Sequence, residues 1–243
     1  MAKAKIIVED KNDKHTYQAI INHIKLQGDL SVSEVEIGWE VSSAENNPKK
    51  PTGLIRTLKS LLNDIRSGSI ERIGIVWDID TDAEQKLETV SNAVSEAFGA
   101  DVIVNLFSKP NEFGSVVFDS GTPEEIEVKV ACFFVGVNGK GEIEDLLKAI
   151  KSQPSPLADC IDEHLPQCLK SHGITDVSDK ELVKLWINNY QRYDHLTKKD
   201  RSTTNTAWEN VMLKRGEQLF DFGKDAVPEL IQLKAFLKMM TED

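Results

Sequence analysis

Residues 74–82, GIVWDIDTD, constrain the fold of this chain most, because an apolar segment there ends abruptly in acidic residues. A short apolar segment bounded by polar residues is typical of a buried strand. Residues two apart on an extended backbone point to the same side, so Asp78 and Asp80 would project together from the strand's carboxyl end. Ligands bind at that end in open α/β sheets.

Neighbouring carboxylates repel each other unless a cation or a proton lies between them. Mg²⁺ prefers oxygen ligands, so Asp78 and Asp80 predict a site for a hard divalent ion. The alternative is a solvated acidic turn that leads into the next helix. We interpret Asp82 as the cap of that helix rather than as a ligand.

The composition favours a protein that folds in water. Of its 243 residues, 40% are hydrophobic and 28% are charged. No apolar run approaches the roughly 18 residues that span a membrane, and the basic start followed by acidic residues does not resemble a signal peptide. Cys132, Cys160 and Cys168 form no CxxC pair, which favours reduced thiols and a cytoplasmic location. The formal net charge of −11 argues against non-specific coating of DNA, but not against a local phosphate site.

Strand-like and helix-like segments alternate along the first part of the chain. Expected strands cover 4–8, 33–41, 71–78 and 102–107, and expected helices cover 14–27, 53–67 and 83–98. This alternation indicates a mostly parallel sheet flanked by helices. The apolar runs 113–119 and 127–135 could pair as a hairpin.

Little strand signal follows residue 152. Periodic segments predict helices at about 156–172, 178–193, 203–214 and 226–240. We therefore expect an α/β catalytic domain over residues 1–151 and a helical region over residues 152–243. The helical region is either a subdomain of its own or packed on the same core.

Two further acidic groups occur where a strand ends or a helix begins. Glu9 follows the first strand, and Asp13 is expected to cap the helix after it. Glu142, Glu144 and Asp145 open a helix after a later strand, where acidic residues also favour the helix dipole. A Glu and an Asp-x-Asp at strand ends can hold one divalent ion, and the third group could hold a second. Two such ions can stabilise the attacking and leaving oxygens of phosphodiester cleavage.

These motifs resemble the Toprim domain, which occurs in topoisomerases, primases, small ribonucleases and OLD-type nucleases. The resemblance rests on the segments 6–13, IIVEDKND, and 75–80, IVWDID. The segment 141–147, GEIEDLL, is similar to the second acidic cluster of the OLD-like branch. One departure is Asp10, because the first motif often has Gly after its Glu.

The resemblance implies roles for individual residues. Glu9 and Asp13 would be metal or general-base positions, and Asp78 and Asp80 would bind the first metal. Glu144 and Asp145 would bind the second. The larger OLD-like nucleases also use a late Lys near the scissile phosphate, and the candidates here are Lys198, Lys199 and Arg201, of which we choose Lys199.

The resemblance implies an Mg²⁺- or Mn²⁺-dependent nuclease that acts on DNA or RNA, and it allows a role in antiphage defence. Some relatives of this kind act beside an ATPase. This chain has no Walker motif, so an ATPase partner would be a separate protein; a homo-oligomer is also compatible with the resemblance.

Two other functions are compatible with the acidic residues. A binding or regulatory module could hold Mg²⁺ and a nucleotide without cutting nucleic acid, and the negative net charge favours it. A phosphatase with an Asp nucleophile would use an Asp-x-Asp-x-Thr/Val pattern near the amino terminus. Asp82 departs from that pattern, and Asp78 lies a third of the way along the chain.

Several other features predict structural roles. The Gly-rich residues 136–141 lack P-loop spacing, so we interpret them as a turn. The five histidines show neither HxxxH nor HExxH spacing, and we expect them on the surface or in helix packing. Trp77 alternates with Asp78 and should point away from the acidic residues.

Overall fold

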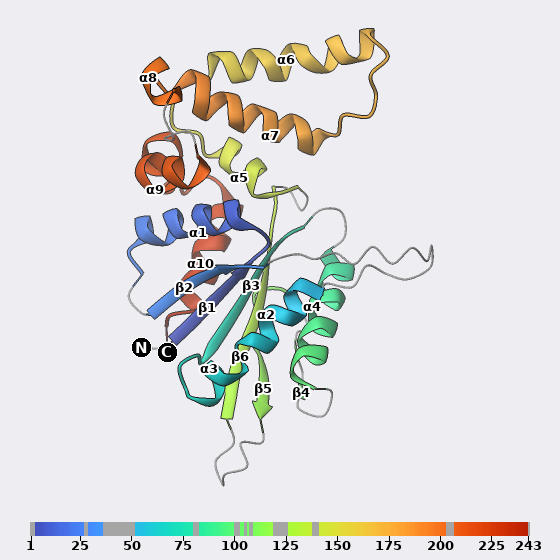
Figure 1. Ribbon diagram of the computed structural model, residues 1–243, viewed down its shortest axis with the longest axis vertical. Helices are drawn as coiled ribbons and strands as arrows, with labels where there is room; N and C mark the ends of the chain where they lie inside the picture. The colour runs from blue at the N-terminus through green and yellow to red at the C-terminus, as the bar shows by residue number, and fades with distance from the viewer. Residues whose placement is uncertain are drawn as a thin grey trace.

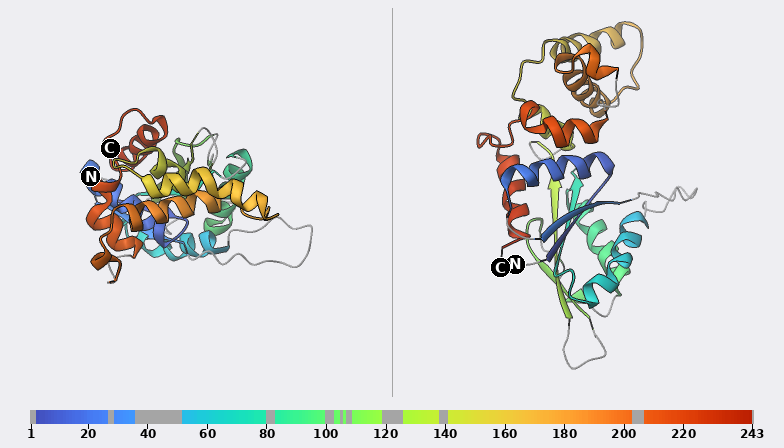
Figure 2. Two further views of the ribbon diagram at one scale, coloured as in Figure 1. Left: turned by 90° about the horizontal axis from the view of Figure 1, so that it is seen from above. Right: turned by 60° about the vertical axis from the view of Figure 1, so that its left-hand side comes forward.

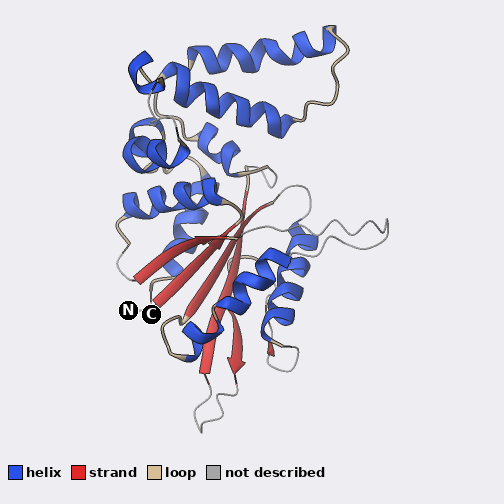
Figure 3. Cartoon of the chain, viewed as in Figure 1, coloured by secondary structure: helices blue, strands red, loops and turns tan. Residues whose placement is uncertain are grey.

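The computed structural model of the chain shows a twisted sheet with helices on both faces and a pair of long helices beyond one end of it (Figures 1 and 3). The structure describes residues 3–26, 29–35, 52–79, 83–99, 103–104, 106, 109–118, 126–137, 141–202 and 207–242. Within these residues, no helix is long and apolar enough to cross a membrane.

The described strands form one sheet with the order β2-β1-β3-β6-β5-β4. Their bounds are β1 Lys3–Val8, β2 Asp29–Glu34, β3 Arg72–Asp78, β4 Ile103–Val104, β5 Gly114–Phe118 and β6 Ile126–Val135. Strands β2, β1, β3 and β6 run parallel, β5 is antiparallel to β6, and β4 is antiparallel to β5. The predicted α/β class with a mostly parallel sheet is confirmed, as is the pairing of the two apolar runs as β5 and β6.

Helices cover both faces of this sheet. Their bounds are α1 Lys11–Ile24, α2 Thr52–Ser60, α3 Leu62–Arg66, α4 Ala83–Phe98, α5 Ile143–Ala149, α6 Pro156–Ser171, α7 Asp179–Asn189, α8 Lys198–Arg201, α9 Trp208–Leu219 and α10 Pro228–Met239, with a π-helix, η2, at Tyr190–Asp194. Helices α2, α3 and α4 share one buried cluster with the sheet. Helices α1, α5, α9 and α10 share the other, to which α6 contributes Ala158 and α7 contributes Trp186 and Ile187, although α6 and α7 lie beyond the end of the sheet (Figure 2).

Strand β3 lies between these two layers and is buried along most of its length. Ile75 and Trp77 belong to the cluster under α2 and α4, whereas Val76 belongs to the opposite cluster. Trp77 therefore points away from the face of Val76, as the alternation predicts. A Cβ on Gly74 would lie 2.7 Å from Cδ1 of Ile6 and 3.1 Å from Phe236, so the absence of a side chain lets α10 pack closely on the sheet.

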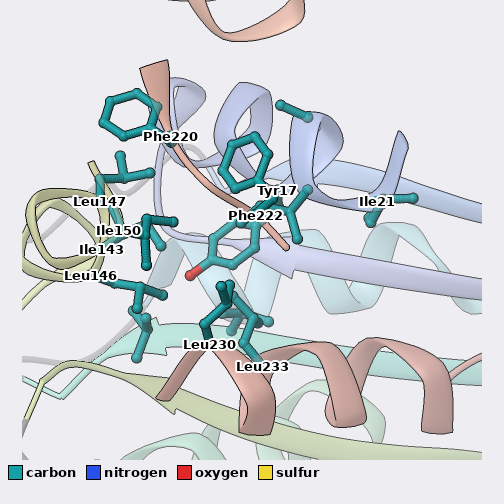
Figure 4. Packing of buried hydrophobic residues seen from close by; sticks show 14 of the residues in the cluster. Tyr17, Ile21, Ile143, Leu146, Leu147, Ile150, Phe220, Phe222, Leu230 and Leu233 are labelled. Carbon is teal, nitrogen blue, oxygen red and sulfur yellow. The ribbon is translucent and has the colours of Figure 1, made fainter. Parts of the chain in front are cut away.

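The carboxyl-terminal helices belong to the main core. Figure 4 shows Tyr17 of α1 among side chains of α5, of the segment after α9 and of α10. Arg72 of β3 donates to the carbonyl of Met239 at 2.9 Å and also to that of Glu242, which fixes the end of α10 against the sheet. The expected boundary at residue 151 falls in the short link between α5 and α6, while α9 and α10 fold back onto the same core as β1, β3 and β6.

Some predicted bounds differ from the observed ones. The helix expected over 53–67 is split into α2 and α3 at Leu61, and the helix expected over 203–214 is observed as α9, which begins at Trp208. The strand expected over 33–41 is β2, which is observed earlier in the chain. Residues 36–41 of that prediction lie outside the described residues.

Candidate metal centre at the carboxyl edge of the sheet

Three adjacent parallel strands bring the predicted acidic residues to one edge of the sheet. Glu9 follows β1, Asp78 ends β3, and α5 begins shortly after β6. The chain continues from β1 to β2 on one side and from β3 toward β4 on the other. The carboxyl ends of β1 and β3 therefore flank the switch point where ligands bind in open α/β sheets.

The segment after β1 places Asp13 in this edge through a helix cap. Asp10 has an extended backbone, and its Oδ1 accepts from the N–H groups of Asn12 at 2.6 Å and Asp13 at 3.0 Å. The carboxylate of Asp13 accepts in return from the N–H of Asp10 at 3.3 Å. The expectation that Asp13 caps α1 is wrong, because a cap residue precedes the first helical turn and Asp10 occupies that place. Asp10, the departure from the Toprim-like pattern, therefore has a structural role.

Asp78 links β3 to the start of α5. Its Oδ1 accepts a hydrogen bond from the N–H of Ile143 at 3.2 Å. Burial raises the pKa of Asp78 to about 9, and repulsion from Asp13, Glu9 and Glu144 adds to the increase. Within the described residues, the hydrogen bond that this carboxylate accepts comes from a neutral donor, the backbone N–H of Ile143.

Asp13 is in a similar environment. It is buried, and burial followed by repulsion from Asp10, Glu144 and Glu9 raises its pKa to about 8. Burial also raises the pKa of Glu144, although Lys184 partly offsets this effect. The carboxylates of these residues thus act on one another, and their mutual repulsion would fall if a cation bound among them.

Tyr17 forms the inner wall of the acidic cluster, which comprises Glu9, Asp13, Asp78 and Glu144. Its side chain is fully buried in the core beneath α1 (Figure 4). Burial raises the pKa of the Tyr17 phenol well above its usual value, and the nearby carboxylates, Asp13 first, raise it further. The phenol therefore stays neutral and places a low-dielectric wall behind the carboxylates.

Of the three carboxylates at the beginning of α5, that of Glu144 belongs to the acidic cluster, whereas those of Glu142 and Asp145 are held by other partners. Asp145 accepts from the N–H of Glu142 at 2.9 Å and so closes the first turn of the helix. Gly141 has a φ of 99°, and a Cβ there would collide with the carboxylate of Asp145. Of the two predicted ligands in this segment, Glu144 is coupled to Asp78 and Asp13, whereas Asp145 is used to cap the helix.

Two lysines of α7 complete this edge. Lys180 and Lys184 pair with the two carboxylate oxygens of Glu142 at 2.9 Å and 2.8 Å. Burial alone would raise the pKa of Glu142, but hydrogen bonds from Lys184 and Lys180 outweigh it and lower that pKa. Glu142 therefore stays ionised beside the other carboxylates and fixes α7 over the start of α5.

Sequence reasoning did not identify these lysines. Their spacing of four residues on a predicted helix was visible, but lysines at that spacing are common on solvated helices. Lys199, the residue chosen from the sequence, is an exposed residue of the short helix α8. Among the described contacts, Lys180 and Lys184 of α7 pair with a carboxylate at this edge, and Lys86 of α4 donates to the backbone carbonyl of Asp78 at 2.5 Å.

The donor set suits a hard divalent cation. The carboxylates of Glu9, Asp13, Asp78 and Glu144 lie near enough to one another at this edge to interact electrostatically, and the Oε2 atom of Glu9 is buried. Within the described residues, no three acidic, His or Cys side chains are arranged closely enough to hold an ion without rearrangement. Asp80, the second Asp of the predicted pair, lies outside the described residues.

The chain was compared with protein families, curated proteins and solved structures. The family described as "Protein of unknown function (DUF3226)" matches residues 3–239. Neither the curated proteins nor the solved structures gave a significant match. The match spans the sheet, the acidic edge and the carboxyl-terminal helices, and this chain therefore belongs to the DUF3226 family.

Proposed function

We propose that this protein is a Mg²⁺- or Mn²⁺-dependent nuclease of the Toprim type that hydrolyses nucleic-acid phosphodiesters. The observation that supports this most is the group of coupled carboxylates at the switch point of the sheet, with the pKa of Asp13 raised to about 8 and that of Asp78 to about 9. Such a group is electrostatically unfavourable by itself and becomes favourable when a divalent cation binds.

Each carboxylate has a separate role in this proposal. Glu9 and Asp78, together with Asp80, hold a divalent cation, and Glu144 contributes to a second one. When bound, these ions supply charge stabilisation to the phosphate and lower the pKa of a bound water. Asp13 suits proton transfer, because its pKa of about 8 lies near neutral pH.

The cationic role assigned to Lys199 passes in this proposal to Lys184. Burial would lower the pKa of Lys184, but the hydrogen bond to Glu142 and the charges of Glu144 and Asp78 outweigh it and raise that pKa. The ammonium therefore stays charged beside the acidic edge, and in this proposal the phosphate approaches from the side of α7. An ammonium near the scissile phosphate stabilises the negative charge of the transition state.

A second candidate is a module that binds a metal and a nucleotide without cleaving nucleic acid. The net charge of −11 favours it, because a long nucleic acid would meet a repulsive surface outside the local site. In this candidate, Lys180 and Lys184 would bind the phosphates of one nucleotide. A separate ATPase is compatible with either candidate.

A nuclease assay distinguishes the two candidates. The purified protein would be incubated with labelled single- and double-stranded DNA and RNA in Mg²⁺, Mn²⁺ or EDTA. The Asp78→Ala/Asp80→Ala variant would be assayed beside it, with Asp176→Asn in an exposed loop as a control. The proposal expects metal-dependent cleavage that the double variant loses and the control keeps. Metal binding by calorimetry without cleavage of any substrate would instead favour the binding module.

A further inference from the structure

Helix α6 contains alternating cysteines and histidines at a constant spacing of four residues. Cys160, His164, Cys168 and His172 follow one another at this spacing, the last as the residue that ends the helix. They include two of the three cysteines and two of the five histidines of the chain. This pattern differs from CxxC, HxxxH and HExxH, because each of those motifs pairs two residues of the same type, whereas here Cys and His alternate.

The helix presents these four residues to solvent. Helix α6 is the outermost helix of the structure, on the side of α7 that faces away from the sheet (Figures 1 and 2). All four residues are exposed, and both cysteines are free thiols. Within the described part of the chain, none of the four side chains makes a hydrogen bond or an ion pair. Burial or hydrogen bonding therefore does not account for the regular spacing of these four residues along the helix.

Neighbouring members of the series can reach a common ion. Residues four apart on a helix are separated by one turn and lie about 5–6 Å apart at their Cβ atoms. Each step rotates the position around the helix by only about 40°. Pro166 lies inside α6, but residues 156–171 remain a single helix, so the register of the series is kept.

We propose that α6 binds thiophilic metal ions of the Zn²⁺ class through the pairs Cys160–His164 and Cys168–His172. Thiolate and imidazole are the ligands that Zn²⁺ prefers, whereas the acidic edge of the sheet offers only hard oxygen ligands. The two regions of the protein therefore select different metals. This proposal does not depend on the proposed nuclease function.

The geometry limits each ion to two protein ligands. No group of three potential ligands within the described residues is arranged to hold one ion, so the series provides pairs rather than a closed site. Water would occupy the remaining positions of a tetrahedral ion. We therefore expect up to two ions per chain, with exchangeable binding and affinities of the order of micromolar rather than those of structural zinc sites.

Titration with Co²⁺ tests this proposal, because cobalt bound to a thiolate has a charge-transfer absorption band that oxygen ligands do not produce. The protein would be titrated in saturating Mg²⁺, which occupies oxygen sites, and Zn²⁺ would then be added as a competitor. Cys160→Ser/Cys168→Ser and His164→Ala/His172→Ala would be compared with Gln167→Ala, an exposed control on the same helix. Circular dichroism would verify that each variant is folded.

The proposal expects a thiolate band that saturates at up to two equivalents and that Zn²⁺ removes. The double Cys variant should lose the band, the double His variant should weaken Co²⁺ binding at least tenfold, and the control should match the parent. Cys132 should not contribute, because it is buried and burial raises the pKa of its thiol to about 12. Absence of the band at millimolar Co²⁺, or an unchanged band in either double variant, would overturn the proposal.

Discussion

The substitution Asp78→Asn tests directly whether the acidic edge is held in an electrostatically unfavourable state. Asparagine has nearly the same shape, and its Oδ1 can still accept the hydrogen bond that Ile143 donates to Asp78 at 3.2 Å. The change removes the ability to ionise. We expect the metal-free variant to be more stable than the parent at neutral pH, although it loses a metal ligand.

The sign follows from the raised pKa of Asp78, which is about 9 in the folded protein against 3.8 for the ordinary group. Between these values the folded state holds a proton that the unfolded state releases, so stability falls as pH rises. If this shift acted in full, it would lower the free energy of unfolding at pH 7 by about 4 kcal/mol. Because the residue is only half-buried and water screens it, we expect a gain of ~1–2 kcal/mol.

Urea unfolding in EDTA at pH 5, 6, 7 and 8 measures this effect. The free energy of unfolding of the parent should fall across this range, by up to about 1.4 kcal/mol per pH unit from Asp78. The Asp78→Asn variant should show a shallower fall, and the exposed control Asp176→Asn should follow the parent. A variant that is less stable at pH 8, or that keeps the parent's pH dependence, would refute the reasoning.

Two further substitutions test the start of α5. Gly141→Ala should destabilise the protein by ~1–3 kcal/mol, because φ is 99° and the added Cβ would collide with Asp145; an unchanged thermal midpoint would contradict this account. Lys184→Gln should cost about 1 kcal/mol, because Glu142 would keep only its pair with Lys180. A double-mutant cycle with Glu142→Gln measures that coupling, and a coupling of zero would mean that the 2.8 Å pair contributes nothing to stability.

Local sequence patterns were enough to predict the helices and strands in which apolar residues recur at a regular spacing. The periodicity of residues 83–98 gave the bounds of α4, and the strand expected over 71–78 is observed as β3, Arg72–Asp78. Bounds were less accurate where side chains from distant segments decide them. The break at Leu61 between α2 and α3 is one such place, since its side chain is buried in the cluster with α4.

The helix cap after β1 shows why residue types alone led to the wrong role for Asp13. Asp10 and Asp13 are both acceptable cap residues, so composition alone does not choose between them. The choice depends on where β1 ends, which its pairing with β2 and β3 decides. Once Asp10 caps α1, Asp13 is turned into the acidic edge, and burial there raises its pKa to about 8.

The sequence alone determined that this chain forms an α/β sheet and that acidic residues follow its strands, because both depend on the short-range pattern of apolar and polar residues. The tertiary structure decided which charges meet. The hydrogen bond between Ile143 and Asp78 spans 65 residues, and the pair between Lys180 and Glu142 spans 38. Burial, protonation and the choice of cation depend on such contacts between distant segments, and these form only when the chain folds.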